Sequence, residues 1–172
     1  WAEPIRPLIQ RALDEKIAAL GICFGHQLLG HHLGCPVVTD PEQSELGTVA
    51  VQLTDAGRGA PLFKGLADSF SVHTGHTDRV SRIPDGVTLL ARNDRCETQA
   101  FHVRDTHFYS VQFHPDMTGS EARARIRAYR EGFSSRLADD GPDYALCFEV
   151  GADESACLIG SMADLAQELS NK

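Results

Sequence analysis

The sequence contains no apolar run long enough to span a membrane, and its start lacks a basic region followed by an apolar stretch. Basic side chains are also few: 16 Lys and Arg stand against 24 Asp and Glu, for a formal net charge of −8. Binding to nucleic-acid phosphates requires clustered basic side chains. We therefore expect a cytoplasmic protein with no membrane or nucleic-acid partner, which acts on a small molecule or binds another protein.

Metal-binding and disulfide patterns are absent as well. The five cysteines form no C-x-x-C pair and are odd in number, which disfavours a zinc framework or a disulfide scaffold. His26, His31 and His32 lie in one predicted helix, but adjacent helical residues face different directions, so we expect solvated histidines and no metal site. No nucleotide-binding signature occurs, and no cofactor is expected.

The 172 residues are 42% hydrophobic, enough for one main domain with a core. Apolar residues at helical spacing predict helices over residues 5–13, 24–33, 119–136 and 153–169. Short apolar runs bounded by turn residues predict strands over residues 17–22, 49–53, 69–73, 87–91, 99–103 and 108–113. Residues 139–142, Asp-Asp-Gly-Pro, have the composition of a linker.

Residues 21–25 read Gly-Ile-Cys-Phe-Gly, the G-x-nucleophile-x-G form of a strained turn from a strand into a helix. We expect Gly21 and Gly25 to be glycine because a Cβ at either position would clash with the neighbouring helix or strand. A cysteine at the amino end of a helix is favoured as the thiolate, and the same N–H groups can bind an oxyanion. The alternative is a buried structural cysteine between two ordinary glycines.

The predicted strand 108–113 runs directly into His114-Pro115-Asp116. Residues i and i+2 of an extended chain point the same way, so the Asp116 carboxylate can reach the His114 imidazole. A carboxylate on one ring nitrogen fixes the tautomer and leaves the other nitrogen to take a thiol proton. Cys23, His114 and Asp116 are thus a candidate catalytic triad, and the alternative is a strand-end histidine beside a solvated aspartate.

Residues 21–29 (Gly-Ile-Cys-Phe-Gly-His-Gln-Leu-Leu) and 111–116 (Val-Gln-Phe-His-Pro-Asp) resemble the two motifs of class I glutamine amidotransferases. Stretches at 45–47, 61–66, 75–80 and 96–101 resemble the same family in the same order, so the resemblance covers roughly residues 3 to 134. It implies an α/β fold, doubly wound and flavodoxin-like, with a mostly parallel sheet flanked by helices. It also implies Cys23 as nucleophile, the Phe24 backbone N–H as oxyanion donor, and Gln27, His76 and Asp78 near the bound glutamine.

This sequence departs from the family in three places. Asp116 stands where the family usually has glutamate, and Thr77 stands where it commonly has glycine. The family's first strands and a glycine-rich oxyanion loop have no counterpart here, so the resemblance implies an N-terminally incomplete catalytic domain over residues 1–134. Residues 135–172 match no family motif and are expected to form a C-terminal helical appendage.

Three functions are compatible with these residues. The first is a glutaminase that hydrolyses the side-chain amide of glutamine through a Cys23 thioester and supplies ammonia to a synthetase on another chain, most like the glutaminase part of GMP synthase. The second is a γ-glutamyl peptidase or hydrolase, which uses the same chemistry on another γ-glutamyl bond. The third is a catalytically impaired fragment or interaction module that keeps the fold without turnover.

Overall fold

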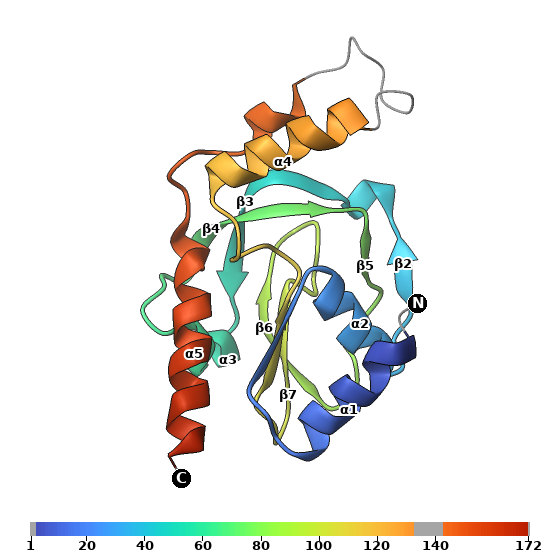
Figure 1. Cartoon of the computed structure of the whole chain (residues 1–172), viewed down its shortest axis with the longest axis vertical. Coiled ribbons are helices and arrows are strands. Elements are labelled where there is room, and N and C mark those ends of the chain that lie inside the picture. Colours follow the sequence, from blue (N-terminus) through green and yellow to red (C-terminus); the bar gives the residue numbers. More distant parts are fainter. Residues whose placement is uncertain (1–2, 133–142, 172) are drawn as a thin grey trace.

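The computed structural model describes residues 3–132 and 143–171 (Figure 1). The helices are α1 (Arg6–Asp14), α2 (Phe24–His32), α3 (Asp55–Arg58), α4 (Gly119–Gly132) and α5 (Cys157–Ser170), with 3-10 turns η1 (Glu3–Ile5), η2 (Pro41–Gln43), η3 (Pro61–Phe63), η4 (Tyr144–Cys147) and η5 (Glu154–Ala156). The strands are β1 (Ala19–Ile22), β2 (Val37–Thr39), β3 (Glu45–Leu53), β4 (Ser69–His76), β5 (Asp78–Val80), β6 (Val87–Arg92), β7 (Ala100–Val103) and β8 (Phe108–Val111).

A six-stranded sheet with the order β1-β8-β7-β6-β3-β4 forms the centre of the fold, and β2 and β5 make a separate antiparallel pair. The expected α/β fold, with a sheet flanked by helices, is confirmed. Among the strand pairs of the described residues, only β1–β8 is parallel, so the sheet is mixed rather than mostly parallel. The parallel pair sets Gly21 opposite Ser110 and Ile22 opposite Val111, which brings the end of β1 beside the end of β8.

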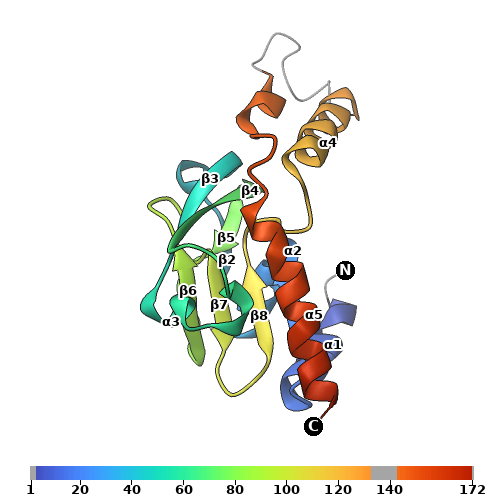
Figure 2. The same ribbon diagram turned by 90° about the vertical axis from the view of Figure 1, so that its left-hand side faces the viewer.

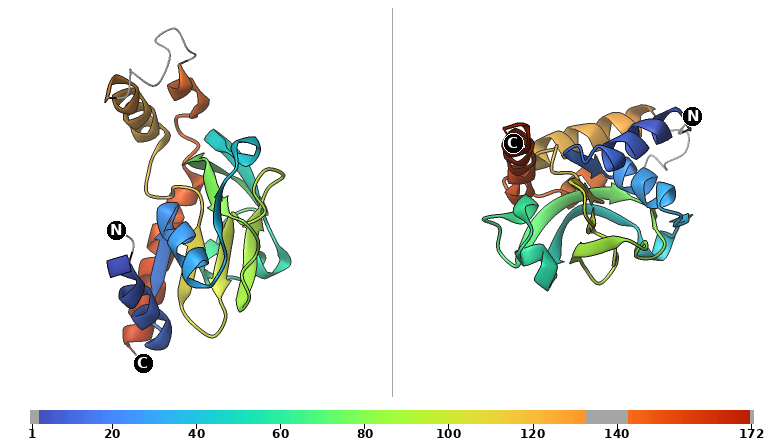
Figure 3. Two further views of the ribbon diagram at one scale, coloured as in Figure 1. Left: turned by 90° about the vertical axis from the view of Figure 1, so that its right-hand side faces the viewer. Right: turned by 90° about the horizontal axis from the view of Figure 1, so that it is seen from below.

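Apolar side chains cover both faces of the sheet because they alternate along its strands. In β8, Phe108 belongs to one buried cluster, whereas Tyr109 and Val111 belong to the other. Helices α1 and α2 cover the first cluster, which contains Phe108, and α3, η3 and α5 cover the second cluster, which contains Tyr109 and Val111. The right-hand view in Figure 3 shows α1 and α2 on one side of the sheet and α5 and α3 on the other.

The predicted helices and strands are present within the described residues, but β3 (Glu45–Leu53) begins well before the predicted strand 49–53 and α5 (Cys157–Ser170) begins after the predicted start at residue 153. The short helix α3 was not predicted. The three-residue strands β2 and β5 were not predicted. Residues 133–136 of the predicted fourth helix and the predicted linker at 139–142 lie outside the described residues. None of the described helices is both long and apolar enough to cross a membrane.

The C-terminal segment, defined as residues 143–171, packs against the rest of the fold. Leu158 of α5 is fully buried in the second apolar cluster, and Phe148 is 2% exposed. Figures 1 and 2 show α5 running alongside the sheet and η4 lying next to α4. A Cβ on Gly47 would lie 2.5 Å from the Cys147 carbonyl oxygen, so a glycine in β3 permits the close approach of η4.

Candidate active site

Cys23 lies at the turn between β1 and α2, where the sequence predicts a nucleophile. Its φ of 47° and ψ of −97° fall in a region that residues with a side chain rarely adopt. A Cβ on Gly21 would lie 2.9 Å from the Gly25 backbone carbonyl, so the clash predicted at this position is confirmed. A Cβ on Gly25 would meet no atom within 4 Å, so the same prediction is wrong for Gly25.

The Cys23 sulfur is partly buried beside the end of β8. The Cys23 backbone N–H donates to the Val111 carbonyl at 2.8 Å, and the Cys23 sulfur accepts from Gln112 Nε2 at 3.7 Å. Burial raises the pKa of the Cys23 thiol and the Asp116 charge raises it further, while the Phe24 backbone N–H and the Arg125 charge lower it. Burial is the largest of these causes and outweighs the helix start, so the pKa of the Cys23 thiol is raised and the expectation of a favoured thiolate is not met in this structure.

His114 and Asp116 meet as the i, i+2 argument predicts. His114 Nδ1 lies 3.0 Å from Asp116 Oδ1, and the two side chains are 17% and 41% exposed. The His114 backbone N–H donates to the His73 carbonyl of β4 at 2.8 Å, which fixes the chain at the start of the loop. Both Cys23 and His114 are described, and no hydrogen bond joins the sulfur to the imidazole. The Asp116 contact leaves His114 Nε2 as the nitrogen that can accept a proton.

A pocket of about 590 Å³ opens beside His114. Its walls are the start of β3, the end of β4, one face of α4 and Phe148 of the C-terminal segment. Arg125 of α4 lines it, donates to Met117 Sδ at 3.2 Å, and pairs with no acidic side chain of the described residues. Cys23 is not among the residues that line the pocket, but the Arg125 charge in the pocket wall acts on its thiol and lowers its pKa.

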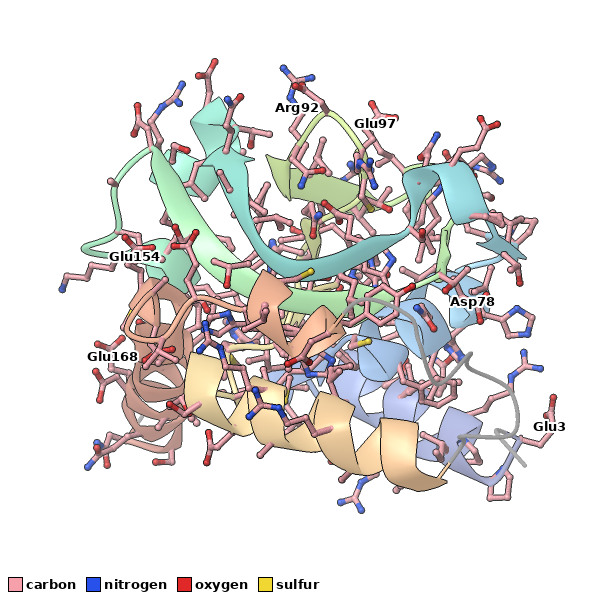
Figure 4. All side chains as sticks on the ribbon, turned by 90° about the horizontal axis from the view of Figure 1, so that it is seen from above. Glu3, Asp78, Arg92, Glu97, Glu154 and Glu168 are labelled. Atoms are coloured by element: carbon pink, nitrogen blue, oxygen red, sulfur yellow. The ribbon has the colours of Figure 1, made fainter. Side chains whose placement is uncertain are left out.

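The three residues that the resemblance places near glutamine occupy different positions. Gln27 Nε2 donates to the Asp78 carbonyl at 2.7 Å, and Asp78 Oδ1 accepts from Thr39 at 2.7 Å. In Figure 4 the labelled Asp78 lies at the α2 side of the molecule. Neither Gln27 nor Asp78 lines the pocket beside His114, whereas His76 forms part of its wall. The His76 side chain is only 1% exposed and is hydrogen-bonded to Glu45, so it supports the pocket wall from the protein interior.

Glu45 is the centre of a buried hydrogen-bond network behind the pocket. Its carboxylate accepts from His76 Nε2 at 3.0 Å, Gln99 Nε2 at 2.5 Å and Asn93 Nδ2 at 2.7 Å. Glu45, His76 and Cys96 also bring possible metal ligands within 4.8 Å of one another. Three donors already satisfy the carboxylate, and burial raises the pKa of the Cys96 thiol, which disfavours the thiolate that binds metals. The donor set therefore fits a structural network better than a metal site.

His26 corrects the expectation that the helix histidines are solvated. Its side chain is fully buried, its Nδ1 lies 2.9 Å from Ser110 Oγ, and its ring centroid is 4.5 Å from that of Phe101. Burial and the charge of His76 lower the pKa of His26 to about 3. His31 is exposed and His32 is half-buried. His26 is therefore a neutral core residue that joins α2 to the sheet.

Three residues at the site were not predicted as such: Glu45, Gln112 and Arg125. Glu45 and Gln112 lie within the family-like stretches at 45–47 and 111–116, but their types alone do not indicate a role. For Arg125 the sequence does hold a signal. Ala122, Arg125, Ile126 and Tyr129 are spaced i, i+3, i+4 and i+7, which places the arginine on the helix face that the pocket shares.

The sequence model of glutamine amidotransferase class-I matches residues 2–129. The chain belongs to this family. A GMP synthase [glutamine-hydrolyzing] of Neisseria meningitidis is 34% identical over 117 residues, 67% of this chain and 22% of that protein. A relative from Thermococcus kodakarensis, named as one subunit of a glutamine-hydrolyzing GMP synthase, is 36% identical over 114 residues, 66% of this chain and 58% of that protein.

The fold of this amidotransferase-family chain also resembles solved structures. A glutamine amidotransferase of Thermotoga maritima superposes with a TM-score of 0.74 at 25% identity, over 95% of this chain and 68% of that one. The chain thus spans less than two thirds of the length of the two curated relatives and about two thirds of the solved structure. The structural match extends beyond residue 129 and so includes much of the C-terminal segment.

Proposed function

We propose that this chain hydrolyses the side-chain amide of glutamine through a thioester on Cys23. The observation that carries the proposal is the placement of Cys23 on a strained strand-to-helix turn, next to strand β8, which leads into the loop with the His114–Asp116 pair. Membership of the class I glutamine amidotransferase family supports it, as does a pocket that has both His114 and the cation of Arg125 in its walls.

The reaction follows from the positions of these groups. His114 Nε2 takes the proton from the Cys23 thiol as the sulfur attacks the amide carbon, and a C–S bond forms. The oxyanion accepts from the Phe24 backbone N–H, whose effect on the Cys23 thiol already marks it as a nearby donor. His114 returns the proton to the leaving nitrogen, the C–N bond breaks, and ammonia departs. Water then hydrolyses the thioester to glutamate and regenerates the thiol.

Asp116 keeps His114 in the tautomer that this sequence of proton transfers requires, through the contact to Nδ1. Phe24 is the one oxyanion donor that we assign.

We further propose that the ammonia passes to a synthetase on another chain. The two curated relatives bear the name GMP synthase, and the one from Thermococcus kodakarensis is named as a single subunit of that enzyme. A mixing experiment tests this step: a cognate synthetase should raise the rate of glutamine hydrolysis, and an unchanged rate would count against the partner.

The first experiment measures ammonia release from glutamine by the parent chain and by Cys23→Ser, with Cys35→Ser as the matched control at a buried cysteine. A glutamine-analogue chloroketone should modify Cys23 in the parent before any other cysteine, located by peptide mass spectrometry. Ammonia release that survives Cys23→Ser, or preferential labelling of Cys35 or Cys96, would remove Cys23 as the nucleophile. Labelling of Cys23 without turnover would support the impaired-fragment alternative.

The pocket volume keeps the γ-glutamyl hydrolase as a second candidate. A pocket of about 590 Å³ falls in the range of roughly 300 to 1,000 Å³ that holds drug-sized ligands, which exceeds the needs of a single amino acid. The exposed Tyr129 and Arg125 on its open side could contact the second residue of a γ-glutamyl peptide. Comparing kcat/KM for glutamine with that for γ-glutamyl dipeptides decides between the two functions.

A further inference from the structure

Asp153 connects the C-terminal segment to the loop that carries His114 and Asp116. Its Oδ1 accepts from the Gly119 backbone N–H at 2.9 Å and lies 2.8 Å from His73 Nε2. His73 is a β4 residue with a fully buried side chain, and Gly119 is the first residue of α4. Asp153 lies outside the range 2–129 that matches the family and outside the pocket walls, so the proposed mechanism does not use it.

The loop from His114 to Gly119 is held at its start by His73 and at its end by Asp153, which is itself bonded to the His73 side chain. At its start, the His114 backbone N–H donates to the His73 carbonyl at 2.8 Å. At its end, Gly119 donates to Asp153, which in turn accepts from the His73 side chain. Backbone and side chain of one residue, His73, thus fix the two ends of the loop, and the second attachment exists only through Asp153.

The surroundings of His73 form a continuous chain of hydrogen bonds. The Glu149 backbone N–H donates to Thr48 Oγ at 2.7 Å, and Thr48 Oγ lies 3.0 Å from His73 Nδ1. A neutral imidazole satisfies every contact if the Thr48 hydroxyl donates to Nδ1 and the Nε2–H donates to Asp153. The ring is packed against Phe148 at a centroid distance of 6.1 Å. His73 is thus oriented from two sides by the C-terminal segment.

The segment also fits tightly against the end of the loop. A Cβ on Gly119 would collide with the Glu149 backbone oxygen, so a glycine is needed where the segment crosses the loop. Arg123 Nε, one turn further along α4, donates to the Phe148 carbonyl at 2.7 Å. These contacts surround the Asp153 hydrogen bonds with backbone that has little freedom to move.

We propose that Asp153 is a positioning residue for catalysis, which holds the His114–Asp116 pair in place by tying the Gly119 end of the 114–119 loop to His73, whose carbonyl holds the other end. The proposal rests on the proposed role of His114 as the base for Cys23. A misplacement of about 1 Å at a reacting group can lower a rate by roughly 10²-fold, so loss of one loop anchor should affect turnover more than substrate binding. Asp153 then contributes to the reaction without lining the pocket.

Glu154 provides a matched control for this role. Its Oε2 accepts from the Ser71 backbone N–H at 2.6 Å, so it also ties the C-terminal segment to β4, but it contacts neither His73 nor the loop. Figure 4 shows the labelled Glu154 beside β4 at the start of α5. A purely structural contribution of the segment should appear equally in Asp153→Ala and Glu154→Ala.

The test measures kcat and KM for glutamine, together with the melting temperature, in the parent, Asp153→Ala, Asp153→Asn and Glu154→Ala. We expect Asp153→Ala to lower kcat by roughly 10- to 100-fold with little change in KM. Asp153→Asn retains an oxygen acceptor for Gly119 and should recover part of kcat. Glu154→Ala should lower the melting temperature and keep the kcat of the parent. A parent-like kcat in Asp153→Ala, or an equal loss in Glu154→Ala, would overturn the proposal.

A second readout separates this proposal from the proposed function. If the parent releases no ammonia from glutamine, the proposed function fails, and the rate of Cys23 alkylation by iodoacetamide at neutral pH takes its place. His114→Ala removes the base and should slow the alkylation, and Asp153→Ala should slow it in the same direction while Glu154→Ala does not. A parent-like alkylation rate in Asp153→Ala or in His114→Ala would overturn the positioning role.

Discussion

Asp116→Asn should slow glutamine hydrolysis while making the Cys23 thiol easier to ionise. The asparagine can present its N–H to His114 Nδ1, which favours the tautomer with the proton on the wrong nitrogen. In a serine protease triad, the same change at a buried aspartate costs about 10⁴ in kcat. Asp116 is 41% exposed, so water can replace part of the lost contact, and we expect a smaller loss of roughly 10- to 100-fold.

The effect on the thiol has the opposite sign because the Asp116 charge is one of the causes that raise the pKa of Cys23. Removing the charge lowers the pKa of the thiol toward its ordinary value, so a larger fraction is thiolate at a given pH. Iodoacetamide alkylation across pH 6 to 10 reports this fraction, and ammonia release reports turnover. A lower alkylation midpoint together with slower turnover is the expected combination.

Arg125→Gln is the control in which the expected change in the Cys23 pKa has the opposite sign. Its charge lowers the pKa of Cys23, so its removal should shift the alkylation midpoint to higher pH. It should also reduce the preference of the site for iodoacetate over neutral iodoacetamide, since the cation has no acidic partner among the described residues. If Asp116→Asn turns over glutamine as fast as the parent, Asp116 has no part in the mechanism and Cys23 and His114 act as a dyad.

Two further predictions concern the fold. Leu158→Ala removes a fully buried side chain and should lower the free energy of unfolding by about 2 to 5 kcal/mol, which lowers the melting temperature by at least roughly 4 °C. Ile159, on the same helix, is 44% exposed, so Ile159→Ala should have little effect. Equal losses of stability in the two variants would contradict the burial of α5. His26 has a pKa of about 3 when folded and an ordinary value of 6.5, so the unfolded chain binds more protons and stability should fall as the pH drops from 6.5 toward 3, by up to about 1.4 kcal/mol per pH unit. Urea unfolding at several pH values should give a smaller slope for His26→Gln, and an unchanged slope would refute the assignment.

Features that depend on neighbouring residues were predicted well from the sequence. The strained turn at Cys23 follows from a strand, a glycine-flanked cysteine and a helix in immediate succession. The His114–Asp116 contact follows from a two-residue spacing at the end of a strand. By contrast, β2 and β5 have only three residues each, too few for a periodic pattern.

Features that depend on tertiary packing could not be predicted. His26 and His31 have similar neighbours in the sequence, but α2 turns only His26 toward the sheet. The thiol pKa of Cys23 is dominated by burial, which local sequence does not reveal. The contact between His73 and Asp153 spans 80 residues, and neither residue belongs to a motif that would connect them.

The resting state of Cys23 gives the long-range contact its importance. Because burial raises the pKa of the Cys23 thiol, the proposed mechanism has the proton pass to His114 as the sulfur attacks. Such a transfer depends on the distance and angle between sulfur and imidazole far more than the attack of a preformed thiolate would. The position of His114 is set by the loop that His73 and Asp153 hold at both ends. We therefore expect the proposed proton transfer to depend on the contacts of His73 and Asp153 that hold this loop, and Asp153 lies beyond the family motifs.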